Sequence, residues 1–243
     1  MGKASDPLLR EITQALPVTT EALSLAGHRA GLVIVDVING FARVGGGALA
    51  PRSPDPMVET TVAETERLAR WFAQHDLPIA VFLDTHQPGR PEPPYPPHCE
   101  QGSGEEELVD ALKWLEACPQ ATLIRKDCIN AFVGAHDHET GENRIVSWVN
   151  DEAVGTVIVV GLCTDICVMD FVLTMLSVRN HGHTPDLHEV VVYAPGCATY
   201  DLPRTAAESA GLPSSAAHPQ ALTHHLGLYF MASRGARIAS AFL

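Results

Sequence analysis

A cysteine follows a short apolar segment in a pattern that suits nucleophilic catalysis. The sequence GLCTDICV begins at Gly161, directly after the apolar run Thr156–Gly161, and places Cys167 at the start of a long apolar stretch. A thiol in the first turn of a helix faces the positive helix end, which lowers its pKa and increases the reactive thiolate. Thr164 or Asp165 could cap that helix. Cys167 is therefore a candidate nucleophile, although a small buried side chain is the commoner role of an unpaired cysteine.

Two ionisable side chains stand where other apolar runs end. Asp36 ends the segment VIVD, and a carboxylate at the end of a buried strand loses hydration, which raises its pKa toward that of a general base. Lys126 ends the segment LIRK, and its charge would favour the anionic forms of a nearby thiol and carboxylate. Taken singly, Asp36 could be a turn former and Lys126 a solvated surface base.

A third pattern offers ligands for a metal ion. Asp84 and His86 stand two residues apart at the end of the apolar run Pro78–Asp84, so their side chains point to the same face of a strand. His98 follows across a proline-rich loop and could supply a third ligand. One carboxylate and two imidazoles with open coordination positions suit zinc, iron or manganese. Asp-x-His by itself is weak support, because it occurs often by chance.

The elements that must position these residues alternate along the chain. Continuous apolar runs favour strands buried on both faces of a parallel sheet; they are Gly31–Val37, Pro78–Asp84, Ala121–Arg125, Thr156–Gly161, Glu189–Ala194 and Ala236–Ala241. Helix-like segments lie between or after them, at Val58–His75, Glu105–Ala117, Thr164–Asn180 and His218–Arg234. The alternation predicts an α/β fold: a single-domain, three-layer αβα arrangement with a mostly parallel sheet of about six strands.

Such a sheet would bring the candidate residues together. In open parallel sheets, ligands bind beyond the carboxyl ends of the strands. Asp36, Asp84, Lys126 and Cys167 all stand at or just after such ends, so we expect them to face one crevice. We expect one domain over residues 29–243, after an N-terminal extension of residues 1–28 without a recognisable motif.

The composition limits the class of protein. Of 243 residues, 46% are hydrophobic and 19% are charged, which is close to ordinary globular usage. The net charge of −13 would repel nucleic acid and an anionic membrane surface. No run is long and apolar enough for a membrane span, and the N-terminus lacks the apolar centre of a signal peptide. We therefore expect a cytoplasmic protein whose six cysteines are free thiols.

The order of these motifs resembles the nicotinamidases, which belong to the isochorismatase-like cysteine hydrolases. The resemblance runs from about residue 30 to the C-terminus and rests on VDVINGF, DTH, YPPHC, Lys126 and GLCTDIC. The order Asp, Lys, Cys is that of the superfamily, and the DTH and PPHC pair is more specific. The segments PEPPYPPHC and RKDCINAFVG resemble the plant-type nicotinamidases in particular.

The resemblance implies a role for each catalytic residue. Cys167 would attack the carboxamide carbon of nicotinamide, and Asp36 would take the thiol proton and pass it to the departing ammonia. Lys126 would hold Asp36 and the thiolate in register. The backbone N–H groups of Cys163 and Cys167 would form the oxyanion hole, with a cis peptide bond between Leu162 and Cys163. Water would then hydrolyse the thioester to nicotinate, a step in NAD salvage.

The resemblance also implies a cofactor and a substrate slot. Asp84, His86 and His98 match the ligands of one divalent metal ion that orients the pyridine nitrogen, zinc being expected ahead of iron or manganese. Phe41 and Tyr95 match the aromatic residues that flank the ring. The implied partner is nicotinamide as a small-molecule substrate, and apolar helix faces favour a homo-oligomer.

Three other interpretations remain open at this point. An isochorismatase or a carbamoyl-group hydrolase would use the same scaffold, but the former generally lacks the nucleophilic cysteine and the latter the metal motif. A relative without activity would have lost some of the motif residues. A generic α/β domain would need independent motifs to fall in this order by coincidence. Metal content separates the first of these cases.

Overall fold

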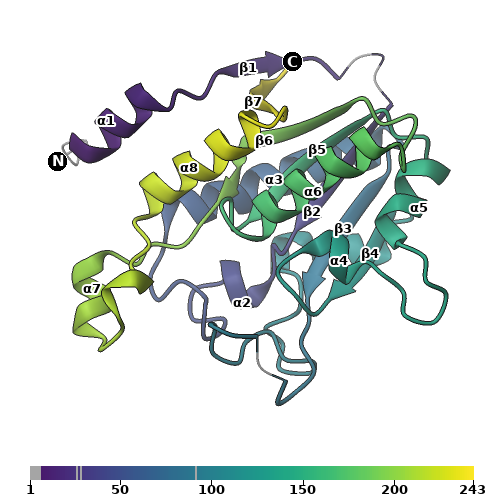
Figure 1. Ribbon diagram of the computed structural model, residues 1–243. Coiled ribbons are helices and arrows are strands. Elements are labelled where there is room, and N and C mark those ends of the chain that lie inside the picture. Colours follow the sequence, from purple (N-terminus) through teal and green to yellow (C-terminus); the bar gives the residue numbers. More distant parts are fainter. Residues whose placement is uncertain (1–6, 26, 28, 91) are drawn as a thin grey trace.

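The computed structural model describes residues 7–25, 27, 29–90 and 92–243, which form three layers (Figure 1). One sheet of seven strands lies between two layers of helices. The strands are β1 (Thr20–Leu23), β2 (Ala30–Val35), β3 (Ile79–Asp84), β4 (Ala121–Lys126), β5 (Thr156–Leu162), β6 (Glu189–Ala198) and β7 (Arg237–Phe242). The predicted αβα class is therefore confirmed.

The strand order is β1-β7-β6-β5-β2-β3-β4, and every neighbouring pair is parallel. Every residue of β2, β3 and β5 is buried, which is why these strands read as continuous apolar runs. The sheet has one strand more than the six predicted. The additional strand, β1, has four residues of which only Leu23 is buried, so its sequence carries no apolar run.

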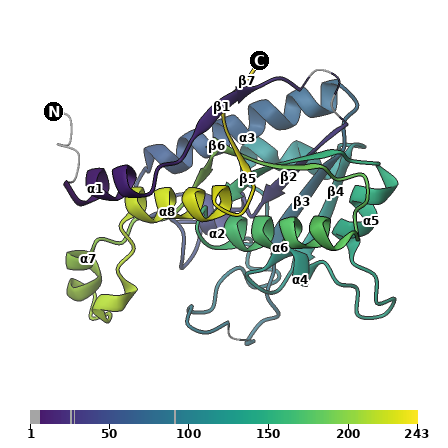
Figure 2. The same ribbon diagram turned by 45° about the horizontal axis from the view of Figure 1, so that its top comes forward.

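Helices cover both faces of the sheet (Figures 1 and 2). The 19-residue helix α3 (Pro56–Gln74) and the 3-10 helix η1 (Asp110–Ala117) pack on one face. The other face is covered by α4 (Ala131–Gly134), α5 (Arg144–Asp151), α6 (Cys167–His181) and α8 (Gln220–Ala232). The remaining helices are α1 (Pro7–Ala15), α2 (Asn39–Ala42), α7 (Arg204–Ser209) and the 3-10 helix η2 (Ser214–Ala216).

The predicted helix over Glu105–Ala117 is shorter and of another type than expected. The structure has the 3-10 helix η1 there, beginning at Asp110. The acidic residues before it bond to the preceding loop: Glu106 accepts the N–H groups of Gly102 and Gly104, and Glu105 accepts that of Cys99. Carboxylates that cap a loop in this way favour turns over a continuous helix.

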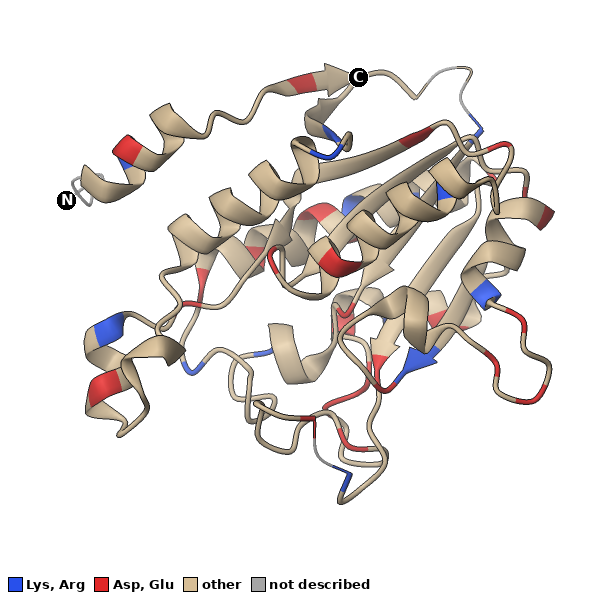
Figure 3. Ribbon diagram, viewed as in Figure 1, with Lys and Arg blue, Asp and Glu red and all other residues tan. Residues whose placement is uncertain are grey.

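The N-terminal segment joins the edge of the sheet. β1 pairs with β7, and the Leu16 carbonyl, just after α1, accepts a hydrogen bond from His225 on α8. Residues 1–6, 26 and 28 of the predicted extension lie outside the described residues. Within the described part of the chain, none of the helices has both the length and the apolar character needed to cross a bilayer. Acidic residues are spread over helices and loops, with the fewer basic residues among them (Figure 3).

Candidate active site

The carboxyl ends of three neighbouring strands bring Asp36, Asp84 and Lys126 into one buried network. The Lys126 Nζ atom lies 2.9 Å from Asp36 Oδ2 and 2.8 Å from Asp84 Oδ1. It also donates a hydrogen bond to the Cys128 carbonyl at 3.0 Å. The Lys126 side chain is completely buried, so this lysine is not the solvated surface base that is usual for its type. It connects the candidate general base to the candidate metal ligands.

Asp36 has the electrostatic character expected of a general base. Burial raises its pKa to about 6, against the opposing charge of Lys126. This agrees with the sequence-based expectation. Its backbone φ of 55° lies in the left-handed region, which residues with a Cβ seldom occupy. The turn after β2 therefore holds Asp36 in a strained backbone conformation, a feature that clusters at functional sites.

Cys167 lies in the first turn of α6, as predicted, although the helix begins at Cys167 and not at Thr164. The expected direction of its pKa is wrong. Burial raises the pKa of the thiol well above its usual value, although the charge of Lys126 opposes this. The N-terminus of a helix contributes typically about 0.3–1 kcal/mol near the surface, which is small beside the loss of hydration at a buried site. The resting thiol is protonated and needs a base, and Asp36 is close enough for its charge to raise the pKa of Cys167 further.

The turn between β5 and α6 depends on a close approach of two strands. Gly161 has φ 133°, and a Cβ at this position would lie 2.0 Å from the Val35 carbonyl oxygen. Only glycine allows β5 to lie this close to β2. The peptide bond between Leu162 and Cys163 is cis, which confirms the expectation. The Cys163 carbonyl then accepts the N–H group of Val168 at 3.1 Å.

The capping of α6 differs from the prediction. The N-cap is Ile166, without a side-chain hydrogen bond, so neither Thr164 nor Asp165 caps the helix. Both side chains instead point to residues near or in α8. The Thr164 hydroxyl bonds His224 Nδ1 at 2.8 Å, and the Asp165 carboxylate accepts from His218 Nε2 at 2.8 Å. These histidines are more than 50 positions away, so local capping preferences could not identify them.

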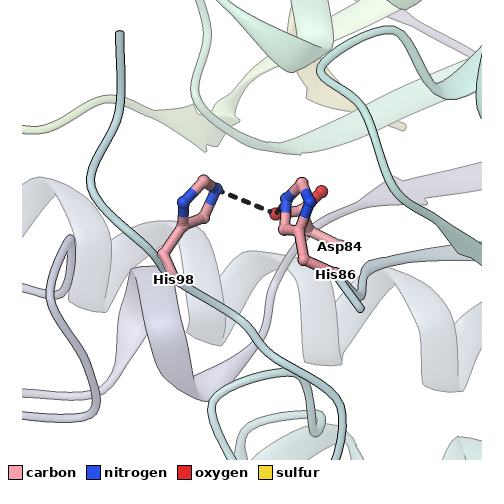
Figure 4. A group of neighbouring side chains, drawn as sticks. All are labelled: Asp84, His86 and His98. Carbon is pink, nitrogen blue, oxygen red and sulfur yellow. Dashed lines mark hydrogen bonds and ion pairs between the residues drawn. The ribbon is translucent and has the colours of Figure 1, made fainter. Parts of the chain in front are cut away.

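Asp84, His86 and His98 form a compact donor set (Figure 4). Asp84 Oδ2 lies 3.0 Å from His86 Nε2 and 3.2 Å from His98 Nε2, and the three ligand atoms lie within 4.8 Å of one another. The other carboxylate oxygen of Asp84, Oδ1, pairs with the Lys126 ammonium group. Burial opposes the ionisation of Asp84, but Lys126 and the two imidazoles hold its pKa well below its usual range.

The surroundings of this donor set fit a divalent cation. The Nδ1 atom of His98 lies 2.8 Å from the Pro96 carbonyl, which can only accept a hydrogen bond, so Nδ1 carries the proton. The Nε2 atom of His98 faces the Asp84 carboxylate, as Figure 4 shows, and in the neutral ring it can offer its lone pair to a metal ion. In most metal sites, the ring nitrogen of histidine that does not bind the metal donates such a hydrogen bond, and this bond orients the imidazole. A buried carboxylate and two imidazoles, one of them oriented in this way, are ligands typical of a zinc ion.

One residue at this site was not identified from the sequence. The Glu92 carboxylate oxygen Oε2 lies 3.7 Å from His86 Nε2 and 3.6 Å from His98 Nε2. Its other oxygen accepts the N–H group of Ile129 at 2.8 Å. Glu92 is the only acid within the segment PGRPEPPYPP, and that is the signal that could have indicated it.

The site opens into a cavity of about 550 Å³. Its walls include Phe41, Asp84, Glu92, Tyr95, His98, Cys163, Cys167 and Tyr200. The rings of Phe41 and Tyr95 lie 5.8 and 6.0 Å from the His98 ring, between centroids, so aromatic surface stands beside the candidate metal site. Part of the wall comes from residues 212–218, for which the sequence indicated no functional role.

The family model for the isochorismatase domain matches residues 30–221. The chain belongs to the isochorismatase family. It is 46% identical over 237 residues to Nicotinamidase 1 of Arabidopsis thaliana, covering 97% of this chain and 96% of that protein. This member of the isochorismatase family is therefore a relative of a nicotinamidase, as its motifs predicted.

Solved structures of family members share the fold. The nicotinamidase of Bacillus subtilis superposes with a TM-score of 0.63 at 21% identity, covering 87% of this chain and 99% of that one. The pyrazinamidase of Pyrococcus horikoshii, in complex with zinc, has a TM-score of 0.60 at 20% identity, covering 86% and 98%. At these identities the likeness concerns the fold alone.

Proposed function

We propose that this protein is a nicotinamidase, which hydrolyses nicotinamide to nicotinate and ammonia and so serves NAD salvage. One observation carries the proposal. Lys126 bridges Asp36 and Asp84, and thereby joins a base and thiol to an Asp/His/His donor set beside one aromatic cavity. A hydrolase of N-carbamoyl compounds has no evident use for that donor set. The relationship to the Arabidopsis nicotinamidase supports the same substrate.

The residues of this chain account for the acyl-transfer chemistry. As the sulfur of Cys167 bonds to the carboxamide carbon, its proton passes to Asp36. The backbone N–H groups of Cys163 and Cys167 stabilise the oxyanion that forms. Asp36 gives the proton to the amide nitrogen, ammonia leaves, and a thioester remains. Asp36 then takes a proton from water as the hydroxyl attacks the thioester, and gives it to the departing sulfur, which restores the thiol. Nicotinate leaves, and its carboxyl proton passes to the solvent.

Lys126 supports both steps without transferring a proton. Its pKa is well above the usual value, because the charges of the carboxylates of Asp36 and Asp84 outweigh the effect of burial. It therefore remains a cation throughout the reaction. A fixed positive charge stabilises the thiolate as it forms and keeps Asp36 in place.

Asp84, His86 and His98 would hold one divalent metal ion, and we propose zinc, with iron or manganese as alternatives. When bound, the ion supplies a Lewis-acidic point that orients the pyridine nitrogen of the substrate. Three N and O ligands with an open position are typical of catalytic zinc sites. The zinc complex of the Pyrococcus pyrazinamidase also supports this choice.

The cavity suits a planar, neutral amide. Phe41 and Tyr95 provide flat apolar surface for the ring. Benzamide lacks the ring nitrogen, so its binding would leave the polar partner of that nitrogen unpaired, and we expect turnover far below that of nicotinamide. Equal turnover of the two amides would contradict this specificity.

We further propose a cytoplasmic protein that acts without nucleic acid or membrane partners, in line with its net charge of −13, and that forms a homo-oligomer. Residues 29–243 would form the hydrolase domain and residues 1–28 an extension to it.

Ammonia release from nicotinamide tests the function. The comparison includes the parent protein, a chelated sample, Cys167→Ala and, as a matched control, Cys118→Ala, which changes a free cysteine outside the cavity. We expect activity in the parent and in the control and loss in the other two samples. Absence of activity in the metal-loaded parent would exclude the proposed function. Activity on nicotinamide that survives removal of the metal ion would contradict the proposed role of the metal site.

A further inference from the structure

The turn that carries the candidate nucleophile is held from outside by α8 and by His218, two residues before that helix begins. His224, on α8, bonds the Thr164 hydroxyl, and His218 bonds the Asp165 carboxylate, each at 2.8 Å. The helix lies directly against the turn, since a Cβ at Gly227 would stand 2.9 Å from the Asp165 Cα atom. Both bonded side chains belong to the four residues between Leu162 and Cys167.

The surroundings of His218 require a proton on each ring nitrogen. Nδ1 lies 2.9 Å from the Tyr200 carbonyl oxygen, and Nε2 lies 2.8 Å from Asp165 Oδ2. A carbonyl and an ionised carboxylate only accept hydrogen bonds, so the ring must donate at both ends. Burial alone would lower the pKa of His218, but the bond and charge of Asp165 outweigh it and raise the pKa. His218 and Asp165 therefore form a charged, largely buried pair.

His218 also lies at the base of a protruding segment, residues 203–217, that forms part of the cavity wall. Leu202 and His218 exchange both backbone hydrogen bonds, at 2.9 and 2.7 Å. The intervening residues 203–217 contain α7 and η2 and protrude beside the start of α8 (Figures 1 and 2). Leu212, Pro213 and Ala216 of this segment line the cavity. The Tyr200 ring stacks on the His218 ring, with centroids 3.8 Å apart and planes 13° apart.

We propose that His218 is a positioning residue for the hydrolysis. Through Asp165 it fixes the turn that presents the Cys163 and Cys167 N–H groups. Through the carbonyl and ring of Tyr200, which its side chain contacts, it fixes the base of the 203–217 wall. The catalytic part of this inference rests on the proposed nicotinamidase function. A merely structural histidine would affect the stability of the fold without changing the rate constant of the folded enzyme.

Kinetics of a double-mutant cycle test the effect on the turn. The variants are His218→Gln, Asp165→Asn and their combination, and the readouts are kcat and KM for nicotinamide with the melting temperature of each protein. Displacement of a reacting geometry by about 1 Å costs roughly 100-fold in rate, so we expect kcat to fall by about 10- to 100-fold. The double variant should lose no more than the worse single variant, because the two side chains act as one unit.

His225→Gln is the matched control, since His225 lies on α8, seven residues after His218, and bonds the Leu16 carbonyl instead of the turn. Its kcat should equal that of the parent. Asp165→Asn keeps the shape of the side chain and so tests the contact if His218→Gln folds poorly. The proposal would be overturned if both folded single variants had the same kcat as His225→Gln. It would also be overturned if the fold-losses in kcat of the two single variants multiplied in the double variant.

A second readout needs no amide substrate. Cys167 is alkylated with iodoacetamide and with a bulky maleimide, and the modified peptide is quantified by mass spectrometry. If His218 fixes the wall, His218→Gln should raise the rate for the bulky reagent relative to the small one, whereas His225→Gln should not. An unchanged ratio would overturn the wall part of the proposal. Failure of the proposed function would appear separately, as an inactive parent protein with a changed alkylation ratio in His218→Gln.

Discussion

The ammonium group of Lys126 lies 2.9 Å from the carboxylate of Asp36, and both side chains are completely buried. Breaking a buried ion pair by removing one partner leaves an uncompensated charge in a medium that solvates it poorly. Lys126 faces a second carboxylate, that of Asp84, so its loss would leave two such charges. The lysine is therefore part of the stability of the site as well as of its chemistry.

Replacement of Lys126 by Met should destabilise the protein and abolish hydrolysis. Removal of one partner of a buried pair typically costs about 3–5 kcal/mol in the free energy of unfolding. Urea denaturation and ammonia release measure the two effects. Lys113→Met is the control, because Lys113 is exposed and pairs with Glu107 and Asp110 at the surface, where a pair contributes about 1 kcal/mol or less. Equal destabilisation by the two variants would contradict the role of the buried network.

Activity should decline as the pH falls through about 6. Burial raises the pKa of Asp36 to about 6, so its proton-accepting form is lost at a higher pH than for an ordinary aspartate. The pH dependence of kcat/KM for nicotinamide reports this group in the free enzyme. An acidic limb near pH 4, the range of an unperturbed aspartate, would show that Asp36 is not the base.

His98→Ala should lower the metal content of the purified protein. The remaining Asp84 and His86 offer only two of the three ligand atoms, and loss of a ligand weakens binding. Elemental analysis of the protein after dialysis against zinc measures the effect. His138→Ala, which removes an exposed histidine outside the donor set, should retain the parent content. Equal metal content in both variants would mean that the ion binds elsewhere.

The Asp165–His218 pair should stabilise the fold most in mildly acidic solution. The pKa of His218 is raised, so its contribution is complete below the unfolded value of about 6.5 and is lost as the pH rises through the folded pKa. The pKa of Asp165 is lowered, chiefly by His218 against the effect of burial. Its contribution is complete above the unfolded value of about 3.9 and is lost as the pH falls through the folded pKa.

The window of greatest stabilisation therefore lies between about pH 4 and 6.5. Thermal unfolding of the parent and of His218→Gln over a range of pH measures it. The difference in melting temperature should be largest inside this window and should shrink on both sides. A difference that is constant with pH would indicate a loss of packing instead of a loss of charge pairing.

The sequence alone was sufficient for six of the seven strands and for the residues at the carboxyl edge of the sheet. Strands buried on both faces must be apolar throughout, so β2, β3 and β5 were visible as runs. Parallel strands end at one edge, which is why Asp36, Asp84 and Lys126 could be expected to meet. The two-residue spacing of Asp84 and His86 likewise predicts a shared face, and this depends only on strand geometry.

The tertiary structure decided what depends on residues far apart in the chain. The direction of the Cys167 pKa follows from burial summed over many neighbours, and the sequence showed only the helix end. β1 forms because its backbone pairs with β7 at the edge of the sheet, and not because its own residues are apolar. His218 stands 53 positions from Asp165, so their pairing required the packing of α8 against the nucleophile's turn. Local pattern determines which elements form, whereas electrostatic character and side-chain partners arise from the sum of non-local contacts.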